Sequence, residues 1–352
     1  MSKAKTNPGN YFEDFKVGAI IKHATPRTIT EGEVALYTAL YGTRFAVQSS
    51  TAFAKSIGYP SAPLDDLLVF HIVFGKTVPD VSLNAVANLG YAECLFHGPL
   101  YPGVTLRTES EVIGVKENSN GKTGTVYVRS KGYDKNNAVV LEYVRWVMVR
   151  KKDPGSKAPE PVVPELSKVV DPSKLGLALP KITPSDYDND LAGSPHRWDD
   201  YEVGEKIDHV DGMTVEEAEH QLATRLFQNT AKVHFNQHTE GQGRFGRRLI
   251  YGGMVISLAR ALSFNGLGNA FHVAAINGGT HVAPLFAGDT VYAWSEVLDK
   301  CEIEGREDIA ALRTRLVATK DLPCGDFPHK DSDGKYQDGV ILDIDLWLTI
   351  LR

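Results

Sequence analysis

The strongest constraint on this chain is that its second half repeats its first. "DFKVGAIIKH" at 14–23 matches "DYEVGEKIDH" at 200–209, and "PLYPGVTL" at 99–106 matches "PLFAGDTV" at 284–291. The order of the matches is kept, and their spacing stays at 185 or 186 residues. The pattern predicts two copies of one domain, because a solenoid is built from several shorter repeats.

The repeat divides the chain into three parts. We assign residues 1–152 to a first domain and residues 198–352 to a second. The joint between them, 153–197, holds eight of the 18 prolines, and proline removes a backbone donor and fixes φ. It therefore cannot be helix or central strand throughout. The second copy has extra residues in a Gly-, Asp- and Pro-rich stretch at 320–339, which predicts a long loop between two strands.

Each copy predicts the same elements in the same order. A first helix is expected at 31–42 and again at 215–229, and a strongly apolar helix at 65–76 and 252–267. A helix that is apolar nearly all round must be covered on most sides. Other segments, such as "TGTVYVRSKGYD", alternate as antiparallel strands with one buried face do. The predicted fold class is α+β, with an antiparallel sheet wrapped around a central apolar helix in each half.

Composition excludes several classes of protein. The formal net charge of −6 argues against a nucleic-acid partner, which needs a concentrated basic face. No apolar run is long enough to predict a membrane span, and the N-terminus lacks the apolar core of a secretory signal. Cys94, Cys301 and Cys324 have unrelated spacings, which argues against a zinc site or a disulfide framework. We expect a cytoplasmic protein without a metal.

One histidine invites a catalytic interpretation. "FQNTAKVHFNQH" at 227–238 contains His234, and a lone histidine of this kind is more often a packing residue. The repeat provides a control, because Asn229, His234 and Gly252 have counterparts in the first copy. These are Thr43, Gln48 and Asp66. All three positions differ together, which favours one active copy and one degenerate copy, with His234 as the candidate catalytic residue.

These residues resemble a known family. A sheet-wrapped helix followed by the strand entry "PLFAGDT" resembles the hot-dog fold. The segment from 227 to 259 is similar to that of MaoC-like (R)-specific enoyl-CoA hydratases, whose motif is G-D-x-N-P-x-H-x-D followed by a helix that begins with glycine. The motif histidine falls on His234, its aspartates on Asn229 and Asn236, and the helix glycine on Gly252. Five positions depart from the motif: Gln228, Asn229, Ala231, Lys232 and Asn236.

The resemblance covers the whole chain as a tandem double hot-dog, and the tandem length and Asn229 make it most similar to the mesaconyl-CoA hydratases within that family. It implies reversible hydration of an enoyl-CoA thioester, with mesaconyl-CoA and water giving β-methylmalyl-CoA. The partner is then an acyl-CoA substrate, with no separate cofactor, and a homodimer is compatible with the family. Two alternatives stay open: a hot-dog thioesterase with Glu240 as base, and a non-catalytic acyl-CoA-binding protein.

The resemblance also implies roles for individual residues. His234 would move the proton, since a neutral imidazole titrates near the operating pH. Asn229 cannot titrate and would position water, while Asn236 would orient the imidazole. Gly252 and Gly253 would let the thioester oxygen approach the N–H groups at a helix start, where the helix dipole also stabilises negative charge.

A second carboxylate on the acyl group would need a cation or several donors. The basic residues near the motif could serve it, or the phosphates of coenzyme A, or remain solvated. They are Lys232, Arg244, Arg247 and Arg248.

Other motifs do not predict sites. "GQGRFG" at 241–246 lacks the preceding strand and the later acidic residue of a dinucleotide-binding loop. We expect structural roles for His97 and His281. His329 has no neighbouring ligands that would complete a metal site.

Overall fold

A single antiparallel sheet of ten strands organises the molecule, whose computed structural model describes residues 5–176 and 178–352. The strand order is β1-β3-β4-β5-β2-β7-β10-β9-β8-β6, so the second half of the sheet repeats the first in mirrored order. The strands are β1 Ile20–Thr28, β2 Ala85–Phe96, β3 Thr105–Glu117, β4 Thr123–Tyr133, β5 Val139–Arg150, β6 Lys206–Thr214, β7 His272–His281, β8 Thr290–Glu302, β9 Ile309–Lys320 and β10 Val340–Leu351.

The two halves join where β2 pairs with β7. In this register Tyr91 lies opposite Gly279, and Cys94 lies opposite Ile276. The two pairs are exchanged by the repeat offset of 185 residues, so an approximate twofold axis passes between the strands. The halves therefore share one continuous sheet.

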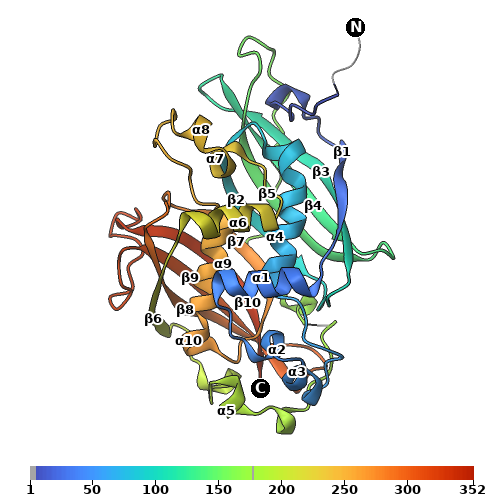
Figure 1. Cartoon of the computed structure of the whole chain (residues 1–352), viewed down its shortest axis with the longest axis vertical. Coiled ribbons are helices and arrows are strands. Elements are labelled where there is room, and N and C mark those ends of the chain that lie inside the picture. Colours follow the sequence, from blue (N-terminus) through green and yellow to red (C-terminus); the bar gives the residue numbers. More distant parts are fainter. Residues whose placement is uncertain (1–4, 177) are drawn as a thin grey trace.

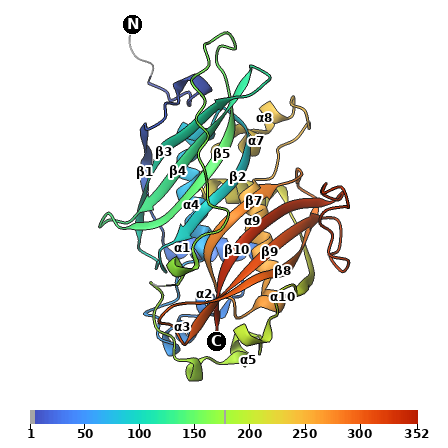
Figure 2. The same cartoon turned by 180° about the vertical axis from the view of Figure 1, so that it is seen from behind.

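The main helices lie together on one side of this sheet, in front of it in Figure 1 and behind it in Figure 2. All of α4 is buried, and in α9 only the first glycine is not. These two helices confirm the prediction of an apolar helix covered by each half-sheet. The helices are α1 Glu31–Tyr41, α2 Ala46–Ser49, α3 Thr51–Ser56, α4 Asp66–Thr77, α5 Asn189–Ala192, α6 Glu217–Leu226, α7 Lys232–Phe235, α8 Gln237–Glu240, α9 Gly252–Leu262 and α10 Phe264–Leu267.

The core is common to both halves. One cluster of buried side chains includes Phe70 from α4, Ile256 from α9 and Leu348 from β10. Burial of apolar surface is the main stabilising contribution in such a core. Because this cluster crosses the boundary between the halves, neither half has a complete core of its own.

The proline-rich joint crosses the outer face of the sheet, where Figure 2 shows it in front of the strands. Its backbone is fixed by side chains of the second half: the N–H of Val170 donates to Asn277 Oδ1 at 2.8 Å, and that of Ile182 donates to Asp308 Oδ2 at 2.7 Å. These hydrogen bonds replace the strand ladder that proline prevents.

Two kinds of feature are absent from the described residues. None of their helices is long and apolar enough to cross a membrane. Within 5–176 and 178–352, no group of three or more His, Cys, Asp or Glu side chains could hold a metal ion.

Candidate active site

The site begins where α6 ends. The helix predicted to reach residue 229 ends at Leu226. Gln228, two residues later, has φ 53°, which lies in the left-handed region that glycine favours. The hydratase motif has glycine at this position. Asn229 follows, 1% exposed, with its N–H bonded to the Thr224 carbonyl at 2.9 Å. Its Oδ1 accepts from the N–H of Ala231 at 3.1 Å, which sets the turn into α7.

His234 is held in one orientation within α7. Its Nδ1 donates to the carbonyl of Leu249 at 2.8 Å, so Nε2 carries the lone pair and can accept a proton. Burial lowers the pKa of His234 to about 4. The imidazole is therefore neutral at neutral pH, and its ring centroid lies 5.5 Å from that of Tyr251.

The orienting role expected of Asn236 belongs instead to this Leu249 carbonyl. Asn236 Oδ1 accepts from the N–H of Thr239 at 3.1 Å and caps α8. An asparagine at a helix start satisfies the nearby backbone N–H groups before it can reach another side chain.

The first turn of α9 presents open backbone donors. Its N-cap residue, Tyr251, makes no side-chain capping bond, and the Tyr251 N–H donates to His220 Nε2 at 3.0 Å. A Cβ on Gly252 would lie 2.5 Å from His281 Cε1, and one on Gly253 would lie 2.6 Å from a ring carbon of His71. Glycine is thus required at both positions, and the positive end of the helix dipole faces the histidines.

His281, for which a structural role is expected, also lies at this helix start. Besides its contact with Gly252, its Nε2 lies 3.1 Å from the hydroxyl of Tyr91. Burial lowers the pKa of His281 to about 4 and those of His71 and His220 to about 3. The site therefore contains uncharged imidazoles in a poorly hydrated environment.

The first half of the chain directly contacts the loop between α6 and α7, which carries Asn229. Gly75 in α4 packs so closely that an added Cβ would overlap the carbonyl oxygen of Phe227. The next residue, Lys76, donates to the side chain of Gln228 and to Thr25 Oγ1 at 3.2 Å. The site is therefore built from both halves, although the motif lies only in the second.

The basic residues expected near the motif lie at the surface. Lys232, Arg244 and Arg247 are exposed, and the Arg247 guanidinium stacks 4.1 Å from the ring centroid of Phe286. Arg248 is half-buried and bonds Gln221 and Glu217 of α6.

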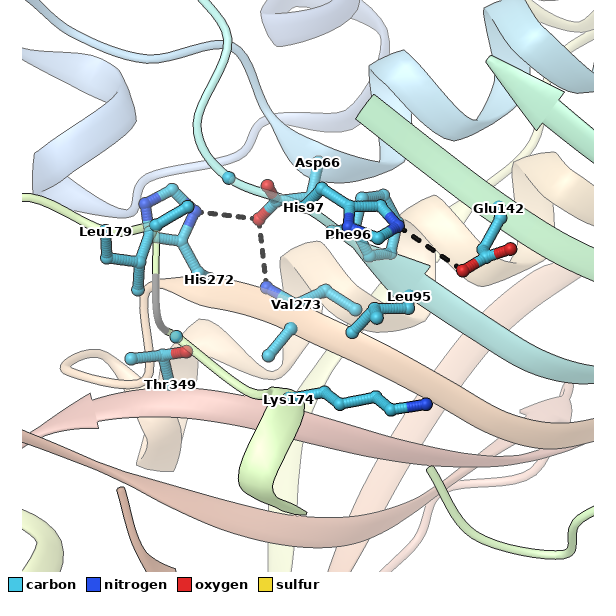
Figure 3. Close-up of a pocket in the computed structure, with 14 residues that line it drawn as sticks. Asp66, Leu95, Phe96, His97, Glu142, Lys174, Leu179, His272, Val273 and Thr349 are labelled. Carbon is cyan, nitrogen blue, oxygen red and sulfur yellow. Dashed lines mark hydrogen bonds and ion pairs between the residues drawn. The ribbon is translucent and has the colours of Figure 1, made fainter. Parts of the chain in front are cut away.

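The corresponding position in the first half is chemically different (Figure 3). Asp66 stands where the second half has Gly252, and its Oδ2 accepts from His272 Nδ1 and from the N–H of Val273, both at 2.9 Å. The side chain of Asp65 caps α4 through the N–H of Leu67. A cavity of about 410 Å³ lies beside them. A carboxylate at this helix start opposes the binding of a developing oxyanion.

The sequence model of the mesaconyl-CoA hydratase family matches residues 1–322. The chain belongs to the mesaconyl-CoA hydratase family. A beta-methylmalyl-CoA dehydratase of Chloroflexus aurantiacus is 64% identical to this family member over 349 residues, covering 99% of each chain. A mesaconyl-CoA hydratase of Cereibacter sphaeroides is 58% identical, covering 99% of this chain and 100% of its own.

Solved structures agree with the predicted fold. A crystal structure of a putative MaoC domain protein dehydratase from Chloroflexus aurantiacus J-10-fl superposes with a TM-score of 0.97 at 62% identity, covering 99% of each chain. A Mycobacterium tuberculosis protein described as having a double hotdog fold gives a TM-score of 0.73 at 24% identity over 98% of this chain and 99% of its own. The prediction of a tandem double hot-dog is confirmed.

Proposed function

We propose that this mesaconyl-CoA hydratase family member catalyses the reversible addition of water to an enoyl-CoA thioester, with mesaconyl-CoA hydrated to β-methylmalyl-CoA. The observation that carries the proposal is the neutral His234, whose Nδ1 is bonded to the Leu249 carbonyl and whose ring packs against Tyr251, the residue before the uncapped first turn of α9. The names of the two close relatives support the same reaction. Coenzyme A enters as part of the substrate, and the reaction needs no further cofactor.

The chemistry follows from these groups. Nε2 of His234 takes a proton from water as the water oxygen bonds to Cβ, and the π electrons move onto the thioester oxygen. The N–H groups of Gly252 and Gly253 stabilise that oxyanion at the positive end of α9. The protonated His234 then delivers its proton to Cα, which completes the addition. In the reverse direction it protonates the departing hydroxide.

Asn229 acts as a positioning residue in this scheme. Its Oδ1 is occupied by the N–H of Ala231, which leaves the amide nitrogen to hold the water oxygen. An amide does not titrate, so His234 is the dominant acid–base group.

The test follows the conjugated enoyl-thioester absorbance of purified protein with mesaconyl-CoA, with free thiol monitored in parallel. We expect loss of the double bond without thiol release. His234→Ala should lower kcat by about 10³-fold, the scale of a lost general base, whereas Asn229→Ala should cost about 10-fold. His238→Ala, at an exposed histidine on α8, is the control and should match the unmodified protein. Thiol release would make the protein a thioesterase, and equal losses at His234 and Asn229 would refute the division of roles.

A further inference from the structure

A buried arginine near the site has no anion. Arg145 on β5 is 1% exposed, and its Nη2 donates to Thr77 Oγ1 at 2.7 Å and to Ser82 Oγ at 3.3 Å. The Nε of Arg145 has no hydrogen-bond partner, and the Arg145 side chain forms no ion pair within the described chain. The buried Lys151 and Arg306 are each paired with a carboxylate, whereas the buried Arg260, which also has no ion pair in the described chain, donates to the Ala270 carbonyl and to Ser263 Oγ at 3.0 Å.

The fold does not require an arginine here. Arg145 lies opposite Tyr91 across the β2–β5 pair, and the repeat places Leu346 opposite Ile276 across the β7–β10 pair. The latter two side chains are 1% and 0% exposed. The same position of the sheet is therefore filled by an apolar pair in the second half, so the charge at Arg145 has a reason other than packing.

The guanidinium is surrounded by further donors. Its Cζ lies 4.2 Å from the ring centroid of Phe74, and three tyrosine rings pack around that same phenylalanine at centroid distances of 5.9 to 6.4 Å. The three are Tyr91, Tyr143 and Tyr251. Tyr91 also lies opposite Arg145 across the β2–β5 pair, and the Tyr143 hydroxyl has no hydrogen-bond partner in the described chain. Burial raises the pKa of each phenol, so the hydroxyls remain protonated donors.

This donor set adjoins the reaction centre. The Tyr91 hydroxyl lies 3.1 Å from His281 Nε2, and the His281 ring contacts Gly252 at the start of α9. Tyr251 immediately precedes Gly252 and packs against His234. Two of the three phenols therefore connect the guanidinium to the groups that handle the proton and the oxyanion.

We propose that Arg145, together with the hydroxyls of Tyr91, Tyr143 and Tyr251, binds the free carboxylate of the substrate's acyl group. The inference rests on the proposed function and names the group that recognises this substrate class. A mesaconyl group is a four-carbon chain with a methyl branch, and its thioester and carboxylate are at opposite ends of that chain. The carboxylate is therefore bonded to Cβ, the carbon to which water adds. It would supply the counterion that Arg145 lacks, in the two-oxygen geometry that guanidinium binds best.

The test compares kcat/KM for mesaconyl-CoA with that for tiglyl-CoA, in which a methyl group replaces the carboxylate on Cβ and the rest of the acyl group is the same. In Arg145→Leu, which installs the residue of the second half, the ratio should fall by about 100-fold. In Arg145→Lys the ratio should be intermediate, because lysine keeps the positive charge but cannot donate two parallel hydrogen bonds to the carboxylate. Arg107→Leu is the matched control: this arginine also stacks on an aromatic ring, at 4.1 Å from Tyr133, but it is paired with Glu109. Its ratio should stay unchanged.

An unchanged ratio in Arg145→Leu would overturn the inference. If that variant does not fold, calorimetry on the unmodified protein tests the inference instead. Succinyl-CoA should bind about 100-fold more tightly than butyryl-CoA, which has a methyl group in place of the carboxylate. Equal binding would overturn the inference as well. Failure of the unmodified protein to hydrate mesaconyl-CoA would refute the proposed function instead, and the binding comparison separates the two results.

Discussion

At the scale of single residues, Gly252 connects the helix start to the histidines. Alanine at this position would place its Cβ 2.5 Å from His281 Cε1 and push the ring or the helix aside. We predict that Gly252→Ala lowers kcat for hydration by about 10²-fold, as loss of an oxyanion donor does, with a smaller change in KM. Steady-state kinetics would show this, and Gly243→Ala, in the exposed loop before α9, is the control. Full activity in Gly252→Ala would exclude the oxyanion role.

The residues of the site differ in how well the sequence predicts them. His234 and Gly252 follow from a motif, because a loop and the next helix start keep their spacing along the chain. His281 and Arg145 reach the site from β7 and β5. Their places depend on which strands become neighbours and on the joining of the two half-sheets, and no local spacing encodes either. Asn236 was misassigned because its capping bond to Thr239 depends on where a short helix begins.

At the scale of elements, α4 is in direct contact through Gly75 with the loop between α6 and α7. We predict that Gly75→Ala lowers hydration activity by about 10-fold or more, because the added methyl overlaps the Phe227 carbonyl and displaces Asn229. Gly32→Ala in α1 is a helical control, whose Cβ would meet only Thr30 Oγ1 at 3.3 Å. Melting temperatures and kcat of both variants would be measured together. Loss of activity in Gly32→Ala but not in Gly75→Ala would contradict the role given to the contact between Gly75 and Phe227.

Elements were predicted well in type and less well at their ends. Apolar periodicity placed both central helices and the paired strands, because burial on one or all sides leaves a pattern in the sequence. The helix expected at 252–267 instead ends at Leu262, and α10 after it contains the non-helical Asn265 and Gly266, the latter with φ 106°. Single backbone angles of this kind leave little trace in composition.

At the scale of the whole molecule, the neutral histidines make folding sensitive to acid. Burial sets the pKa of His71 and His220 at about 3 and of His234 and His281 at about 4, against 6.5 when unfolded. The unfolded chain then binds protons that the folded one does not, so stability is full above pH 6.5 and falls as the pH drops toward 4. The expected slope is about 1.4 kcal/mol per pH unit for each histidine.

Unfolding in urea at several pH values would measure that slope. His71→Gln should flatten it, because glutamine does not titrate, whereas substitution of the exposed His238 should leave it unchanged. A free energy of unfolding that is constant from pH 7 to pH 5 would contradict the prediction.

The continuous sheet has a further consequence for how such a protein can specialise. In a dimer of identical chains every substitution is present in both subunits, so a residue that improves one site also changes the symmetry-related site. Here the Tyr91–Arg145 pair and the Ile276–Leu346 pair occupy equivalent places with different chemistry. Covalent fusion lets one half keep the reacting groups while the other supplies a cation and a supporting helix. The chain should accordingly bind one substrate per polypeptide.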